Sequence, residues 1–232
     1  MKLFVWDLHG VLEYGNHRAA VDISNAILGR FGHPERFTYE DGIELYGRKW
    51  YEYFEWLLPD ARHGHCLELQ DACFELSESD LVFQRQWLSA TPCAQPVLAK
   101  IKEQHEQLLI SNTRSGNLEI FLKTLQLEEF FSAPQTALAV DGHMQAADRT
   151  KNDVLREYLD GRGHSYEEIV IIGDSPSDMR LADVAGGVTY LYAHPEFPFR
   201  TANADRHIRD LCSVVERIEE SWSACGQDAS PR

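Results

Sequence analysis

The stretch Met1–Leu12, MKLFVWDLHGVL, contains the pattern on which the fold depends. Its apolar residues run from Leu3 without a polar interruption and stop at Asp7. An unbroken apolar run is typical of a strand buried on both faces, as in a parallel sheet. The stretch therefore predicts a buried strand that delivers the carboxylate of Asp7 to an active site.

Three further apolar runs end in polar or small residues: EQLLISNT (106–113), EEIVIIGDS (167–175) and GVTYLY (187–192). Between and after them, apolar residues recur at helical spacing in QPVLAKIKEQHEQ (95–107), SGNLEIFLKTLQ (115–126), KNDVLREYL (151–159) and IRDLCSVVERIEESW (208–222). Strands that alternate with helices predict an α/β fold with a doubly wound, mainly parallel sheet. In such sheets the ligand site lies at the carboxyl ends of the strands.

Residues 13–90 have a different character, because helix-like segments occur there without a convincing strand. These segments are HRAAVDISNAILGRFG (17–32), RKWYEYFEWLL (48–58) and LELQDACFEL (67–76). The two prolines of TPCAQP (91–96) mark the return of the chain to the sheet. We therefore expect an α/β core of residues 1–12 and 91–232 with an inserted helical cap of residues 13–90. The tail SACGQDASPR (223–232) is expected to be frayed.

Composition excludes several classes of protein. The 232 residues carry a formal net charge of −15, which argues against a nucleic-acid or anionic-membrane partner. No apolar run approaches the ~20 residues that a membrane span needs. The five cysteines are odd in number and irregularly spaced, which does not indicate a disulfide framework. We expect a soluble cytoplasmic protein that is a monomer or a homodimer.

Chemically active side chains gather at the predicted strand ends. They are Asp7, Ser111, Asn112, Asp174 and Asp178, and Lys151 begins a neighbouring helix. Carboxylates with a hydroxyl and an ammonium group suit a hard divalent cation such as Mg²⁺ together with a phosphoryl group. A carboxylate nucleophile that faces a phosphate is repelled unless positive charge screens both groups, and a metal ion and Lys151 can supply that charge.

Four motifs, in this order, resemble those of the haloacid dehalogenase superfamily. They are DLHGVL (7–12), LLISNT (108–113), Lys151 within RTKNDVL, and GDSPSDM (173–179). The helical residues 13–90 correspond to the cap that many members carry after the first strand. The resemblance implies a Mg²⁺-dependent phosphatase for a small phosphorylated metabolite, whose cap closes to exclude water and select the substrate.

The resemblance also assigns roles to single residues. It implies that Asp7 is the nucleophile that forms an aspartyl-phosphate. Ser111 and the backbone of Asn112 hold a phosphoryl oxygen, and Lys151 neutralises the nucleophile and the phosphate. Asp7 and Asp174 ligate Mg²⁺, and Asp178 supports the metal or its waters.

His9 departs from the superfamily pattern, which normally has an aspartate as general acid and base two positions after the nucleophile. The backbone carbonyl of His9 still serves as the metal ligand that the resemblance implies. Imidazole has an unperturbed pKa near ~6.5, against ~3.9 for aspartate, so it can exchange protons close to neutral pH. Three interpretations stay open: His9 is a working acid and base, it only fills space, or it marks impaired turnover.

Substrate-binding candidates outside the motif core are cations. Gly47, Arg48 and Lys49 resemble the loop that caps of this type place over the substrate, and Arg114 follows the SNT motif. Arg48 and Lys49 are also consistent with a solvated helix start. The stretch HGHC (63–66) fits no standard zinc spacing.

Other functions compete with the phosphatase interpretation. Lys49 is the only lysine in the expected cap, and a cap lysine serves as a Schiff base in phosphonate cleavage within the superfamily. Carbon–halogen hydrolysis needs no metal and leaves Asp174 without a use. A phosphate-binding regulatory protein with a decayed site is the third alternative, and it rests on His9 alone.

Overall fold

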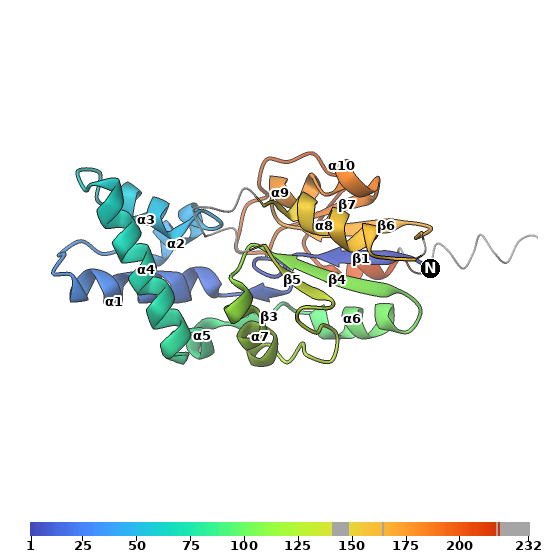
Figure 1. Cartoon of the computed structure of the whole chain (residues 1–232), viewed down its shortest axis with the longest axis horizontal. Helices are drawn as coiled ribbons and strands as arrows, with labels where there is room; N and C mark the ends of the chain where they lie inside the picture. The colour runs from blue at the N-terminus through green and yellow to red at the C-terminus, as the bar shows by residue number, and fades with distance from the viewer. Residues whose placement is uncertain (141–148, 164, 217, 219–232) are drawn as a thin grey trace, which may run out of the picture.

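The computed structural model describes residues 1–140, 149–163, 165–216 and 218. Figure 1 shows two parts side by side along the long axis, a group of helices at one end and a sheet covered by helices at the other. The amino terminus lies on the part that holds the sheet.

The sheet has six parallel strands in the order β5-β4-β1-β6-β7-β8. The strands are β1 (Leu3–Trp6), β4 (Glu106–Ser111), β5 (Ala137–Ala139), β6 (Ile169–Gly173), β7 (Val188–Tyr192) and β8 (Arg206–Ile208). All four predicted strands are confirmed, whereas the short edge strands β5 and β8 are additional. Because β1 lies between β4 and β6, Asp7 follows a strand in the middle of the sheet.

Helices cover both faces of this sheet, which confirms the doubly wound α/β fold. The helices α6 (Ala94–Lys102), α7 (Ser115–Thr124) and the 3-10 helix η1 (Leu211–Val215) pack with Phe4 and Trp6 of β1. The helices α8 (Lys151–Asp160), α9 (Pro176–Met179) and α10 (Ala182–Ala185) pack on the face that holds Leu3 and Val5. Both faces of β1 are buried, and this accounts for its unbroken apolar sequence.

Two helix predictions are corrected. The expected helix 208–222 is wrong at its start, because Ile208 is the last residue of β8 and pairs with Tyr192. The Asp210 side chain then accepts a hydrogen bond from the Cys212 amide and begins η1. The expected helix 95–107 ends at Lys102, because residues 106 and 107 belong to β4. The tail 223–232 lies outside the described residues.

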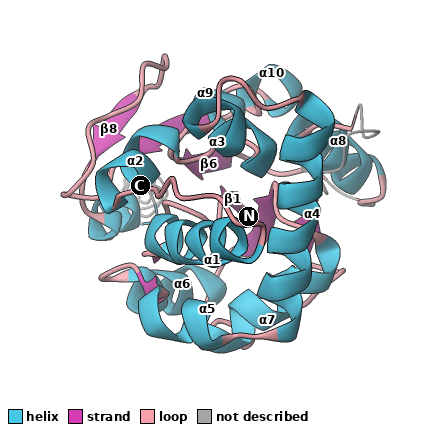
Figure 2. Cartoon of the chain, turned by 90° about the vertical axis from the view of Figure 1, so that its left-hand side faces the viewer, coloured by secondary structure: helices cyan, strands magenta, loops and turns pink. Residues whose placement is uncertain are grey.

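Residues 13–90, which we call the cap, hold five helices: α1 (Asn16–Arg30), α2 (Tyr39–Leu45), α3 (Trp50–Leu57), α4 (His63–Ser79) and α5 (Val82–Trp87). They enclose an apolar cluster of their own, in which Tyr53 and Phe54 are buried. Figure 2 shows the cap helices in front of the sheet when the molecule is seen from the cap end. The chain enters and leaves through a short antiparallel pair, β2 (Glu13–Tyr14) and β3 (Ser89–Ala90), which the sequence did not indicate.

His63 and Cys66 of the cap contact other cap residues. His63 contacts Glu55 at 2.5 Å on the surface, and Cys66 is buried in α4. Within the described ranges, the groups that could hold a metal ion are elsewhere, one around Asp7 and one formed by Cys93, Asp210 and Cys212.

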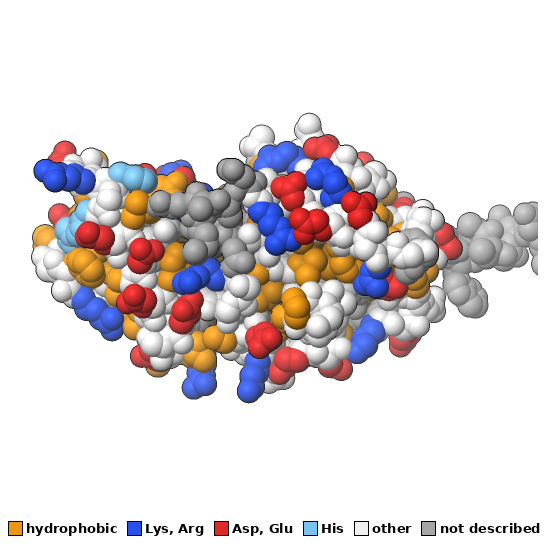
Figure 3. Space-filling model, in the orientation of Figure 1, with side chains coloured by type: hydrophobic (Ala, Val, Ile, Leu, Met, Phe, Trp, Pro, Cys, Tyr) orange, Lys and Arg blue, Asp and Glu red, His pale blue; other side chains and the backbone are white. Residues whose placement is uncertain are grey.

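The described cysteines are free thiols, and Cys225 lies outside the described residues. Among the described residues, no helix combines the length and apolar character needed to cross a membrane. On the face shown in Figure 3, acidic and basic side chains are interspersed over both parts of the molecule.

A buried histidine makes the stability of the fold sensitive to acid. His17 of α1 is 1% exposed, and its ring lies 5.0 Å from that of Phe197. Neither ring nitrogen has a hydrogen-bond partner among the described residues. Burial, reinforced by Arg18, lowers the pKa of His17 to about 4. The fold therefore has its full stability above the pKa of ~6.5 that the histidine has in the unfolded chain. It loses stability as the pH falls toward 4, because the unfolded chain binds the proton more readily than the folded one.

We therefore expect protonation of His17 to lower the free energy of unfolding by about 3 kcal/mol between pH 7 and pH 4. Urea denaturation at both pH values, with His17→Phe as the comparison, measures this contribution. The variant should lose less stability than the wild type on acidification. An equal loss in the two proteins would contradict the assignment.

Candidate active site

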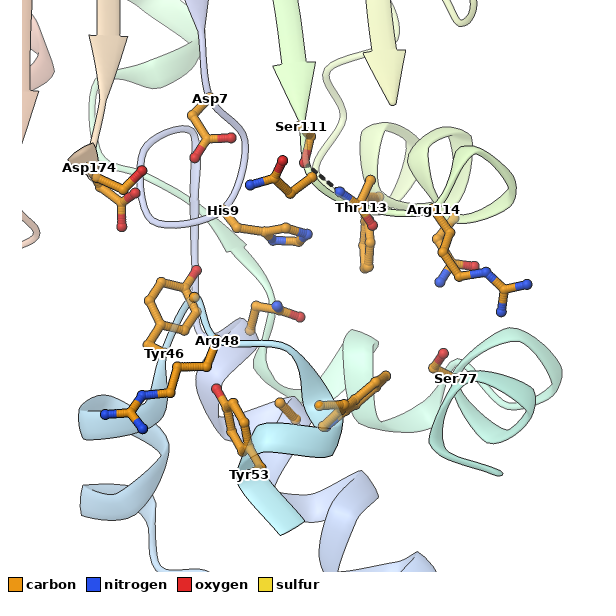
Figure 4. A pocket seen from close by; sticks show the side chains of 18 of the residues that line it. Asp7, His9, Tyr46, Arg48, Tyr53, Ser77, Ser111, Thr113, Arg114 and Asp174 are labelled. Atoms are coloured by element: carbon orange, nitrogen blue, oxygen red, sulfur yellow. Dashed lines mark hydrogen bonds between the residues drawn. The ribbon is translucent and has the colours of Figure 1, made fainter. Parts of the chain in front are cut away.

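The carboxyl ends of the central strands bring the predicted residues together. Asp7 follows β1, and its amide donates a hydrogen bond to the carbonyl of Ile172 in β6. Gly173 ends β6 at a point where a Cβ atom would lie 2.0 Å from the Cβ of Asp178. Only glycine leaves room for the first turn of α9 there, and Asp178 consequently reaches the strand end. Figure 4 shows Asp7, Asp174 and Ser111 at neighbouring strand ends.

Lys151 joins two of the carboxylates. Its Nζ lies 2.7 Å from Oδ1 of Asp7 and 2.6 Å from Oδ1 of Asp178, and all three side chains are buried. Burial alone would lower the pKa of Lys151, but Asp178 and Asp7 outweigh it and raise the pKa above its usual range. Lys151 therefore stays charged between the two carboxylates.

The three aspartates have more negative charge than Lys151 balances. Oxygen atoms of Asp7, Asp174 and Asp178 lie within 4.8 Å of one another. Burial and the two neighbouring carboxylates raise the pKa of Asp174 to about 8, although Arg200 acts in the opposite direction. Burial and Asp178 also raise the pKa of Asp7. A cluster of oxygen ligands that lacks positive charge fits a hard divalent cation.

Gly10 keeps space open beside this cluster. It has a φ of +83°, and a Cβ atom at this position would lie 2.5 Å from Oδ2 of Asp174. A side chain here would push the Asp174 carboxylate out of place, and a left-handed φ would strain any residue that carries one. The glycine of the DLHG stretch thus preserves the oxygen cluster.

Ser111 and Asn112 lie across from Asp7 at the end of β4. Ser111 is buried, and its Oγ accepts a hydrogen bond from the amide of Thr113 at 3.3 Å. Both Ser111 and Asn112 line the same cavity as Asp7. Their position is suited to meet an oxyanion opposite the Asp7 carboxylate, because the Ser111 hydroxyl still has a proton to donate.

This cavity of about 190 Å³ lies between the sheet and the cap. Its core side is polar and is formed by the strand-end residues. Its cap side combines apolar residues such as Ile23 and Trp50 with polar ones such as Asn16, Arg48 and Gln84. The cavity therefore joins a charged end to a cap end of mixed character that can contact the non-reacting part of a small ligand.

His9 stands at the boundary of these two ends. Its ring lies between the strand-end carboxylates and the cap residues Tyr46 and Tyr53 in Figure 4. The rings of His9 and Phe121 pack nearly at right angles, with their centroids 4.9 Å apart. The side chain is 20% exposed, and the ring faces the cavity.

The predicted substrate-binding cations have different positions. Arg48 and Arg114 line the cavity, but in Figure 4 their side chains extend to opposite sides of the view. Arg114 pairs with Glu78 of the cap at 2.8 Å. Lys49 is not among the lining residues, and its Nζ lies 6.0 Å from the ring centroid of Tyr51.

Arg200 is a site residue that the sequence did not indicate. Its Nη2 donates a hydrogen bond to the carbonyl of Tyr46 at 2.9 Å and lies 3.5 Å from Oδ2 of Asp174. It therefore connects the cap to the carboxylate cluster. Arg200 belongs to a loop after β7 without a recognisable motif, so only the folded structure reveals this position.

Comparison with known proteins agrees with this fold. The family model of haloacid dehalogenase-like hydrolases matches residues 1–186. No curated protein matches the sequence.

Among solved structures, a predicted phosphoglycolate phosphatase from Haemophilus somnus has a TM-score of 0.74 at 15% identity, covering 93% of this chain and 97% of that one. A HAD family hydrolase from Deinococcus radiodurans with bound phosphate and sodium has a TM-score of 0.67 at 16% identity, covering 95% and 96%. A haloacid dehalogenase-like hydrolase from Streptococcus pneumoniae has a TM-score of 0.67 at 15% identity, covering 93% and 97%.

The six-stranded sheet with helices on both faces makes this an α/β protein, and the family model covers more than half of the chain. The chain belongs to the haloacid dehalogenase-like hydrolase family.

Removal of Lys151 should destabilise the protein strongly. Lys151→Met leaves Asp7 and Asp178 buried and facing each other without a cation, which should lower the free energy of unfolding by about 3–5 kcal/mol. Chemical denaturation of Lys151→Met alone and together with Asp178→Asn measures the effect.

The double variant should regain part of the stability, because one of the unpaired charges is gone. Lys123→Met, on the exposed side of α7, is the matched control and should change stability by no more than about 0.5 kcal/mol. Equal effects of the two lysine substitutions would exclude a buried ion triad.

Proposed function

We propose that the protein is a Mg²⁺-dependent phosphatase that hydrolyses a small phosphorylated metabolite through an aspartyl-phosphate on Asp7. The observation that carries the proposal is the ion triad, in which the buried Asp7 carboxylate lies 2.7 Å from Nζ of Lys151 at the charged end of the cavity. Membership of a hydrolase family supports it. So do the structural neighbours described as a predicted phosphoglycolate phosphatase and as a hydrolase with bound phosphate.

The proposed reaction has two displacements at phosphorus. An Asp7 oxygen attacks the phosphorus atom, an Asp7 O–P bond forms, and the bond to the leaving oxygen breaks. Water then attacks the same phosphorus, releasing inorganic phosphate and restoring the Asp7 carboxylate. Lys151, the Ser111 hydroxyl and the Asn112 backbone hold the phosphoryl oxygens and offset their charge in both steps.

The metal would be held by the side chains of Asp7 and Asp174 and the backbone carbonyl of His9, with Asp178 in support. When bound, it supplies positive charge that reduces the repulsion between the Asp7 carboxylate and the phosphate. Asp178 also accepts hydrogen bonds from the amide and hydroxyl of Ser175, and this keeps its carboxylate oriented.

His9 is proposed as the general acid and base. Its ring faces the cavity beside the Asp7 carboxylate, where the leaving oxygen of a bound phosphate ester would lie. It would protonate that oxygen in the first displacement and accept a proton from water in the second.

The competing functions gain no support from the cavity. Phosphonate cleavage on a cap lysine needs an amine in the cavity, but Lys49 does not line it. Carbon–halogen hydrolysis offers no use for the third carboxylate of the cluster. A purely regulatory phosphate-binding role predicts binding without turnover, and an activity assay distinguishes it directly.

The first experiment is hydrolysis of p-nitrophenyl phosphate. The purified protein should be active with Mg²⁺ and inactive with EDTA, and Asp7→Asn should abolish turnover because an amide is not a nucleophile at phosphorus. Asp160→Asn, at the exposed end of α8, is the matched control and should keep activity. Full activity of Asp7→Asn would contradict the proposal.

A second experiment tests His9 through the leaving group. His9→Ala should lower kcat/KM by about 10²-fold or more for an alkyl phosphate, whose leaving oxygen needs a proton. The loss should be much smaller for p-nitrophenyl phosphate, whose leaving group departs as a stable anion. Equal losses on the two esters would favour the space-filling interpretation of His9.

A further inference from the structure

We propose that Glu13 is a positioning residue for His9, and that Tyr46 connects this pair to the cap. Glu13 would hold the imidazole by Nδ1, so that Nε2 faces the leaving oxygen of the substrate. The inference rests on the proposed phosphatase function and concerns a carboxylate to which neither the motifs nor the proposed mechanism gives a role.

Glu13 is a carboxylate in an unusual place. It is 0% exposed, although it lies on β2 at the entrance to the cap. Its Oε1 lies 3.3 Å from Nδ1 of His9 and accepts a hydrogen bond from the Tyr46 hydroxyl at 3.3 Å. Burial of a carboxylate is costly unless it has specific partners, and His9 and Tyr46 are the partners placed to meet that cost.

The backbone fixes Glu13 with respect to His9. The amide of Glu13 donates to the carbonyl of Leu8, and the amide of Gly10 donates to the carbonyl of Glu13, both at 3.0 Å. These two bonds close a tight loop around His9, and the positive φ of Gly10 allows its turn. Phe121 packs against the ring from another side. The position of the imidazole is thus constrained by backbone, carboxylate and aromatic contacts.

The contact determines which nitrogen can act on a ligand. Nδ1 of His9 is buried toward Glu13, which leaves Nε2 as the nitrogen available to the cavity. A carboxylate beside Nδ1 favours the form with hydrogen on that atom, the arrangement by which carboxylates orient imidazoles in hydrolytic sites. Nδ1 and Oε2 of Glu13 have no hydrogen-bond partner among the described residues. Such catalytic contacts commonly tighten only when the substrate is bound.

Tyr46 makes the pair depend on the position of the cap. It follows α2, and its hydroxyl reaches Glu13 from the cap side. Arg200 lies over its ring, 5.4 Å from the centroid, and holds its carbonyl. Movement of this segment of the cap away from the core would remove one of the groups that orient Glu13.

The test uses the full-length protein with Mg²⁺ and compares Glu13→Gln, Glu13→Asp and Tyr46→Phe. Glu13→Gln should lower kcat/KM for an alkyl phosphate by about tenfold or more, with a much smaller loss for p-nitrophenyl phosphate. Glu13→Asp should recover part of the loss. In the His9→Ala background, Glu13→Gln should cause no further loss, because the residue through which it acts is gone. Tyr46→Phe, which keeps the ring, should also lower kcat/KM more for the alkyl phosphate than for p-nitrophenyl phosphate, but by a smaller factor than Glu13→Gln.

A direct readout is the ¹⁵N spectrum of His9 at fixed pH. Hydrogen on Nδ1 is expected in the wild type, and Glu13→Gln should shift the population toward the other nitrogen. This measurement needs no turnover, so failure of the phosphatase proposal is distinguishable from failure of the Glu13–His9 contact. Equal losses on both esters, additive losses in the double variant or an unchanged spectrum would each overturn the inference.

Discussion

The site depends on the ion pairs that the buried ammonium group of Lys151 forms. This group bonds to Asp7 after β1 and to Asp178 in α9, so that two carboxylates occupy the interior beside a third, Asp174. Lys151 and Arg200 bring two positive charges to three carboxylates, and burial together with the neighbouring carboxylates raises the pKa values of Asp7 and Asp174. The site is therefore built to receive further positive charge, which explains why a cation and a phosphate ester belong to the same proposal.

The cap and the core meet through polar contacts that surround the carboxylate cluster. Arg200 joins the Tyr46 carbonyl to Asp174, and Arg114 of the core pairs with Glu78 of the cap. Around them the cap contributes both apolar and polar residues to the wall of the cavity. Under the proposed function, the reacting group would lie at the strand ends and the rest of the ligand would lie against the cap.

Much of the fold could be predicted, because four strands carry continuous apolar runs that end in polar residues. The edge strands β5 and β8 could not be predicted. Each has only three residues and a neighbouring strand on one side, and so short a segment leaves no clear periodicity. Ile208 satisfies a helical pattern equally well, and only its pairing with Tyr192 decides for a strand. For the site, the predicted convergence of the polar strand ends is seen in Asp7, Asp174 and Asp178, whose oxygen atoms lie within 4.8 Å of one another. Arg200 lies 154 positions from Tyr46, and such a contact is created by packing rather than by spacing.

The ion triad also has a consequence for how the chain reaches its native state. Asp7, Lys151 and Asp178 come from segments far apart in the sequence, and each is buried only when the others are in place. A chain with an incompletely assembled sheet would leave these charges in water, where they are fully solvated. The three charges of the triad therefore lose their contact with water only where β1, α8 and α9 come together.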